Sequence, residues 1–146
     1  MESFLIKIEP TNYIFEVFGD ESAETELHWS DNPPVGKAKG AFAVALPDLE
    51  IGETFSATVC FTDTPIEEQN TFSKHVIYTF NGKIEITDVV ESQIVGSEGF
   101  VGTLYSLPWS GFTEIMLSAP KGFSRNSEGE LVPLGLHLTF SPASKT

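Results

Sequence analysis

The dipeptide Asn81-Gly82 lies between two runs that alternate between apolar and polar side chains, residues 74–80 and 83–87. Such alternation is typical of β-strands, because successive side chains point to opposite faces of a sheet. A two-residue Asn-Gly loop favours a type I′ turn, in which both central residues adopt a positive φ. The sequence therefore predicts a β-hairpin here and favours a fold built from short antiparallel strands.

The same alternation recurs along the chain, and proline or turn residues separate the alternating segments. No convincing long helix interrupts this pattern. We predict about nine strands, at 4–8, 13–18, 41–46, 54–62, 74–80, 83–87 (extending as far as Val90), 100–105, 112–117 and 134–140.

The length of 146 residues suffices for one buried core, and twelve phenylalanines can fill the space between two sheets. We therefore expect an all-β fold, an antiparallel β-sandwich that forms a single domain over residues 1–140. Residues 141–146 are expected to form a flexible C-terminal tail. An open barrel is the alternative, because strand number alone does not distinguish the two architectures.

Acidic residues are concentrated in the first half of the chain. The net charge is −13, and residues 1–73 hold fourteen acidic and three basic residues, so that this half carries −11. Such a surface repels nucleic acids and anionic membranes and attracts a basic protein or a cation. An acidic surface that serves only solubility is an equally simple interpretation.

Cys60 is the single cysteine, so no intramolecular disulfide can form. It shares a face of its strand with Ser56 and Thr58, opposite the apolar Phe55, Ala57, Val59 and Phe61, and it has no basic neighbour in sequence that would activate the thiol. The sequence shows neither a signal peptide nor an apolar run long enough to cross a membrane. We expect a cytoplasmic protein.

No motif indicates catalysis or a cofactor. The three histidines (His28, His75 and His137) have no metal-ligand spacing, and the chain contains no Gly-x-Ser-x-Gly elbow or phosphate-binding glycine loop. Asp20, Glu21, Glu24 and Asp31 offer oxygen ligands for calcium, but their spacing does not match an EF-hand. We predict that the chain is not an enzyme and needs no metal or cofactor.

Trp29 follows the densest acidic stretch, on a segment expected to be a loop. A tryptophan among acidic residues can anchor a protein partner, or it can fill the core beneath its own loop. The pattern favours the core position for the ring. Trp109, between Pro108 and Ser110, allows the same two interpretations.

Several of these segments resemble the competence protein J family in order and spacing. They are Tyr13-x-Phe15-x-Val17-Phe18, Trp29-Ser30-Asp31, the small residues Gly36, Ala38 and Gly40, Ser73-Lys74, Phe80-x-Gly82-x-Ile84-x-Ile86, Leu107-Pro108 and Gly111-Phe112-x-x-Ile115. The family's proteins are small acidic cytoplasmic inhibitors of a bacterial DNA-entry nuclease. The resemblance therefore implies an inhibitor of a basic enzyme, a nuclease or a toxin.

The residues predicted to bind this partner lie in the acidic stretch and beside it: Asp20, Glu21, Glu24, Glu26, Trp29 and Asp31. Their carboxylates can occupy phosphate positions in a basic cleft and accept charge-assisted hydrogen bonds from Arg and Lys. Two other classes of function remain open. One is a carbohydrate- or calcium-binding module that uses Trp29, Trp109 and Tyr105, and the other is a phage or secretion-system structural protein that forms a homo-oligomer.

Overall fold

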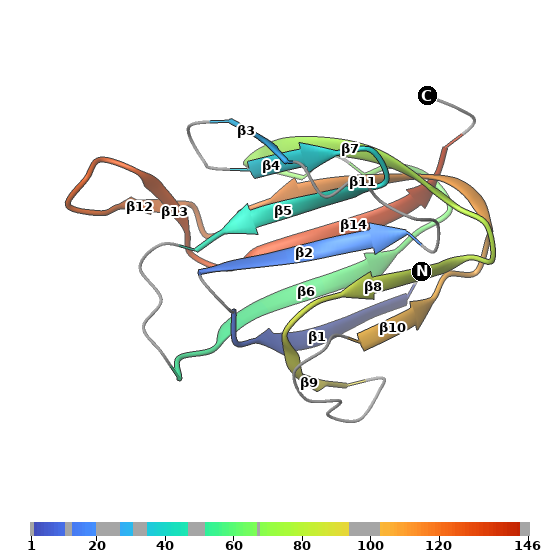
Figure 1. The fold of residues 1–146 in the computed structure, drawn as a ribbon, viewed down its shortest axis with the longest axis horizontal. Coiled ribbons are helices and arrows are strands. Elements are labelled where there is room, and N and C mark those ends of the chain that lie inside the picture. The colour runs from blue at the N-terminus through green and yellow to red at the C-terminus, as the bar shows by residue number, and fades with distance from the viewer. Residues whose placement is uncertain are drawn as a thin grey trace.

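Two six-stranded β-sheets pack face to face in the computed structural model, which describes residues 2–10, 13–19, 27–30, 35–46, 52–66, 68–93 and 103–143 (Figure 1). Sheet A has the strand order β7 (Thr71–Thr79), β11 (Gly111–Ser118), β14 (Leu136–Pro142), β6 (Phe55–Phe61), β1 (Glu2–Ile8) and β9 (Val89–Ser92). Sheet B has the order β10 (Thr103–Ser106), β8 (Lys83–Ile86), β2 (Ile14–Gly19), β5 (Ala41–Ala45), β4 (Val35–Ala38) and β3 (His28–Trp29). This arrangement confirms the predicted all-β sandwich.

The core lies between the two sheets and is built by the alternation seen in the sequence. In β6, Ala57, Val59 and Phe61 are buried, whereas Ser56, Thr58 and Cys60 lie on the outer face of sheet A. Rings meet across the core: Phe4 of β1 lies 5.3 Å from Tyr105 of β10, centroid to centroid. The period of two residues therefore decides which face of each strand is apolar.

One strand pair departs from the predicted antiparallel order. β14 pairs with β6 in parallel, with Leu138 opposite Val59. All other pairings in the described part of the chain are antiparallel. β14 thereby joins the β7–β11 end of sheet A to the β6–β1–β9 end.

The hairpin predicted at Asn81-Gly82 is wrong. β7 before it pairs with β11 in sheet A, while β8 after it pairs with β2 and β10 in sheet B. Gly82 has a φ of 68°, but Asn81 lacks the positive φ that a type I′ turn also requires. The dipeptide is a corner between sheets, where the amide of Leu107 donates a hydrogen bond of 2.7 Å to the Gly82 carbonyl.

A second corner divides the strand that was expected to extend from 83 to Val90. β8 ends at Ile86 in sheet B, and β9 begins at Val89 in sheet A. Asp88 between them has a φ of 60°. The Thr87 hydroxyl accepts a hydrogen bond of 2.8 Å from the Glu16 amide, which holds the corner against β2.

The structure contains fourteen strands in its described part, against about nine predicted. The additional ones are short: β3, β4, β9 and the hairpin of β12 (Phe123–Arg125) and β13 (Leu131–Pro133), which projects from one end of the sandwich (Figure 1). The last strand is longer than predicted, because β14 extends to Pro142 and Ser141 is buried. Residues 144–146 of the expected tail lie outside the described residues.

No helix in the described ranges has the length and apolar character needed to cross a membrane.

Candidate partner-binding site

Trp29 lies on β3, the short strand at one edge of sheet B. Its side chain is 45% exposed, so the prediction that the ring fills the core is wrong. The indole packs over Gly36 of β4, where an added Cβ would lie 2.9 Å from Cε2 of the indole. Because glycine leaves this place open, the ring can rest on the neighbouring strand and still present its other side to solvent.

Ser30 holds the β3–β4 pair together where β4 begins. The Ser30 amide donates to the Val35 carbonyl at 2.9 Å, and the Ser30 hydroxyl accepts from the Val35 amide at 3.3 Å. These contacts join the residue that follows β3 to the first residue of β4. Trp29, next to Ser30, is therefore on a backbone with a defined position at the sheet edge.

The five acidic residues predicted to bind a partner, Asp20, Glu21, Glu24, Glu26 and Asp31, lie outside the described residues. The described strands locate only the ends of their segments. Residues 20–26 follow Gly19, whose amide donates a hydrogen bond of 3.1 Å to the Gly40 carbonyl. Both acidic segments connect to β3, the strand that carries Trp29.

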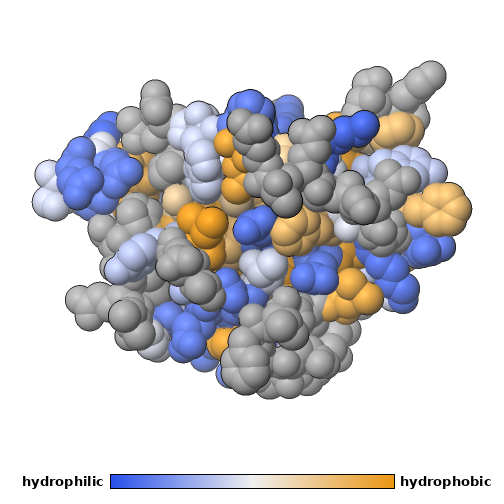
Figure 2. Space-filling model, in the orientation of Figure 1, coloured by the Kyte–Doolittle hydropathy of each residue, from blue (hydrophilic) through white to orange (hydrophobic). Residues whose placement is uncertain are grey.

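Figure 2 shows one face of the molecule, on which hydrophobic and hydrophilic residues are interspersed. Large apolar residues with substantial exposure include Tyr13, Trp29, Phe80 and Leu104. Exposure of single apolar side chains is common in proteins, so Trp29 is distinguished by its acidic neighbours in sequence rather than by exposure alone.

His75 lies inside the sandwich near the same edge. Its ring stacks on Phe42 of β5, with centroids 4.2 Å apart and planes 8° apart, and its Nε2 lies 2.8 Å from the Ser73 hydroxyl. Burial, assisted by the positive charge of Lys37, lowers the pKa of His75 from 6.5 to about 3. The neutral imidazole therefore acts as a packing group between the sheets, as expected for a histidine without a site role.

The aromatic residues considered for carbohydrate binding do not form an exposed platform. Tyr105 is 2% exposed and packs on Phe4 in the core. Trp109 packs against the core in a T-shaped contact with Phe61, and its indole N–H donates a hydrogen bond of 2.9 Å to the Thr113 hydroxyl. Only Trp29 of the three is exposed, so this set was predicted wrongly.

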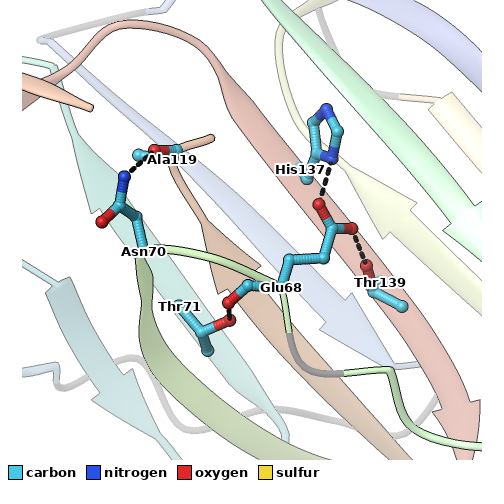
Figure 3. A network of polar contacts seen from close by, with 6 residues as sticks. All are labelled: Glu68, Asn70, Thr71, Ala119, His137 and Thr139. Carbon is cyan, nitrogen blue, oxygen red and sulfur yellow. Dashed lines mark hydrogen bonds and ion pairs between the residues drawn. The ribbon is translucent and has the colours of Figure 1, made fainter. Parts of the chain in front are cut away.

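Other chemistry-bearing groups lie on the outer face of sheet A. Burial, assisted by the charge of Glu68, raises the pKa of the Cys60 thiol, which makes an activated nucleophile unfavourable. His137 and Glu68 form a contact of 2.8 Å that sequence spacing did not indicate, because the residues come from distant segments (Figure 3). Among the described residues, no group of three or more His, Cys, Asp and Glu side chains is arranged to hold a metal ion.

The chain resembles a protein of known structure in its fold. No family model matches the chain, and no curated protein matches its sequence. The crystal structure of ComJ from Bacillus subtilis, an inhibitor of the DNA degrading activity of NucA, is similar over 98% of this chain and 96% of ComJ. The TM-score is 0.51 and the sequence identity is 13%. The two chains therefore share their fold over nearly their whole lengths.

Proposed function

We propose that this protein binds and inhibits a nuclease with a basic active-site cleft. The observation that carries the proposal is the fold shared with ComJ over 98% of the chain, since ComJ is an inhibitor of a DNA-degrading enzyme. At 13% identity the target nuclease is not inherited with the fold, so the surface of this chain has to supply the rest of the argument.

The charge of the chain supports a basic partner. A nuclease cleft collects Lys and Arg side chains to bind phosphates. The first 73 residues carry a net charge of −11, and their densest acidic stretch leads into the strand of Trp29. In the proposed complex the carboxylates of Asp20, Glu21, Glu24, Glu26 and Asp31 occupy phosphate positions, and they accept charge-assisted hydrogen bonds.

Trp29 supplies the apolar part of the interface. An exposed tryptophan resting on a regular strand can bury a large area while losing little conformational freedom. The carboxylates would then determine the association rate and its salt dependence, whereas the indole would slow dissociation. In this mechanism the chain blocks the cleft and performs no chemistry of its own.

The test begins with a pull-down from lysate of the source cells at low salt, followed by elution with a salt step. The eluate should degrade linear DNA, and adding back the purified protein should suppress that activity. Inhibition should weaken as salt is raised from about 50 mM to about 500 mM, because exposed charges are then screened. An eluate without nuclease activity, or with activity that the protein leaves unchanged, would contradict the proposal.

Charge reversal separates the acidic stretch from net charge. The inhibition constant of the triple variant E21K/E24K/D31K should rise at least about 100-fold, since its lysines would face a cleft of the same charge. The matched control D63K/E91K/E128K changes the net charge by the same amount at three exposed acidic residues elsewhere. If both triple variants inhibit equally, the proposed surface is wrong even if the nuclease is the right partner.

A further inference from the structure

An open groove with a volume of about 430 Å³ lies on the outer face of sheet A, beside the base of the β12–β13 hairpin. Its walls are largely apolar and come from four separate parts of the chain: Leu5, Phe55, Pro120, Pro133 and Leu134. This volume falls in the range of small-molecule sites, which combine apolar walls with a few polar groups. The groove is remote in sequence from Trp29 and takes no part in the proposed inhibition.

Five residues with polar side chains line this groove, and three of them, Thr54, Ser56 and Thr58, carry hydroxyl groups. His137 of β14 and Lys121 both line it. Glu68 contacts His137 but does not line the groove (Figure 3). Nδ1 of the imidazole thus contacts Glu68, and among the described residues no hydrogen-bond partner meets Nε2, which leaves this nitrogen for a ligand.

Glu68 is itself held in place. Its Oε2 lies 2.8 Å from Nδ1 of His137, and its Oε1 accepts a hydrogen bond of 3.4 Å from the Thr139 hydroxyl. Its backbone carbonyl accepts a hydrogen bond of 2.7 Å from the Thr71 hydroxyl. The turn that follows, residues 69–70, is also anchored, because the Asn70 side chain donates a hydrogen bond of 3.1 Å to the carbonyl of Ala119, directly after β11. A carboxylate supported in this way can determine the orientation of the imidazole.

The tautomer of His137 follows from this pairing. An ionised carboxylate only accepts hydrogen bonds, so Nδ1 of His137 must be the donor in the contact with Glu68. In the neutral ring, Nε2 then carries a lone pair and accepts a hydrogen bond. A ligand head group at Nε2 must therefore donate a hydrogen bond. The negative charge of Glu68 behind the ring also disfavours an anionic head group.

We propose that this groove binds a small apolar alcohol or phenol. The hydrocarbon body lies against Leu5, Phe55 and Leu134. The hydroxyl donates to Nε2 of His137, and its oxygen accepts a hydrogen bond from the Lys121 ammonium. Glu68 acts as a positioning residue, because it holds the tautomer that accepts the hydroxyl proton.

The probe pair is 2-naphthol and 2-methoxynaphthalene, which share a ring system but differ in the hydroxyl proton. Titration of the full-length protein at pH 8, followed by two-dimensional amide NMR, should give saturable shifts in Phe55–Thr58 and in Leu136 and His137. We expect 2-naphthol to bind at least about tenfold more tightly, as for one added hydrogen bond to a preorganised acceptor. Equal affinities, or shifts confined to other regions, would overturn the proposal.

Variants test the assignment of each group. H137F should lower the affinity for 2-naphthol about tenfold while leaving the affinity for 2-methoxynaphthalene unchanged. E68L should also lower the ratio of the 2-naphthol affinity to the 2-methoxynaphthalene affinity. If Glu68 had only a structural role, E68L would instead lower the affinities for both probes by the same factor. Amide dispersion in each spectrum shows whether the variant is folded, and the ratio of two ligands measured on one sample does not depend on its stability.

Two exposed leucines provide a matched steric pair. Leu134 lines the groove and is 49% exposed, whereas Leu104 lies on β10 of sheet B and is 56% exposed. L134E should abolish binding of both probes, and L104E should leave both affinities unchanged. If L104E weakens binding as much as L134E, the probes bind elsewhere and the groove is not their site.

Discussion

His75 should make the stability of this protein strongly dependent on pH below neutrality. The side chain is 7% exposed and stacked on Phe42, and Nε2 is engaged by Ser73. Burial first, and the nearby Lys37 second, lower its pKa from 6.5 to about 3. Protonation therefore requires either a charge inside the sandwich or local opening of the sheet edge.

The sign follows from proton uptake. The unfolded chain binds a proton at this residue near pH 6.5, and the folded chain binds it only near pH 3, so unfolding takes up protons between these values. The contribution of His75 to the free energy of unfolding is complete above pH 6.5 and is lost as the pH falls toward 3. At pH 4.5, two units below the unfolded value, the loss is about 3 kcal/mol.

Acidic groups act in the opposite direction, so the comparison must isolate His75. Protonation of carboxylates reduces the repulsion within a chain of net charge −13. Glu16 contributes in the same sense, because burial and the charge of Asp88 raise its pKa, and its unfavourable ionisation in the folded state is relieved as the pH falls. Both effects persist when His75 is replaced.

The assay is chemical unfolding of the wild-type protein, H75F and H28Q at pH 7.5 and pH 4.5. H75F keeps a ring against Phe42, and its loss of the Ser73 hydrogen bond should matter similarly at both values. Between pH 7.5 and pH 4.5, the free energy of unfolding of the wild type should fall by about 2–3 kcal/mol more than that of H75F. H28Q, which replaces an exposed histidine on β3, should behave as the wild type. Equal pH dependence of wild type and H75F within about 0.5 kcal/mol would refute the reasoning.

Three further predictions concern glycine, serine and the tryptophan. G82A should lower the free energy of unfolding by about 2–4 kcal/mol, because residue 82 has a positive φ and the added Cβ would collide with the Trp109 carbonyl. In the same denaturation assay G52A should cost only about 1 kcal/mol, since φ is also positive there but no atom lies within 4 Å of the added Cβ. S141A should raise the free energy of unfolding by about 1 kcal/mol, since the buried Ser141 hydroxyl has no hydrogen-bond partner in the described part of the chain, and a loss of stability would reveal such a partner. W29A should weaken inhibition of the captured nuclease at least tenfold, and G36A, which displaces the indole, should have an intermediate effect; wild-type inhibition by W29A would exclude the anchor role.

The alternation in the sequence predicted which face of each strand is buried better than it predicted which strands pair with one another. Ala57, Val59 and Phe61 point inward as expected, and His75 shares its inward position with Ile77. Strand partners were not predictable in this way, since a hairpin and a corner between sheets preserve the same inward pattern. At Asn81-Gly82 the deciding contact is with residues 107–109, which are distant in sequence.

The missed β12–β13 hairpin shows another limit of periodicity. Its turn is polar and is held largely by side chains. Oδ1 of Asn126 accepts hydrogen bonds from the amides of Glu128 and Glu130, and its Nδ2 donates to the Glu130 carboxylate. The Arg125 guanidinium donates a further hydrogen bond to the Gly129 carbonyl. Gly129, with a φ of 81°, completes the turn. Asn126 followed three residues later by glycine was the available sequence signal, but the short flanking strands carry little alternation.

The two proposed surfaces differ in how far the sequence could indicate them. Trp29 and its acidic neighbours lie close together in the chain, so composition and order alone indicate a partner-binding region there. The groove on sheet A is assembled from segments up to about 130 residues apart, and Glu68 reaches His137 across 69 positions. A binding region formed from one segment leaves a local signal in sequence. A pocket formed by strand order has none until the order β14–β6–β1 of sheet A is established.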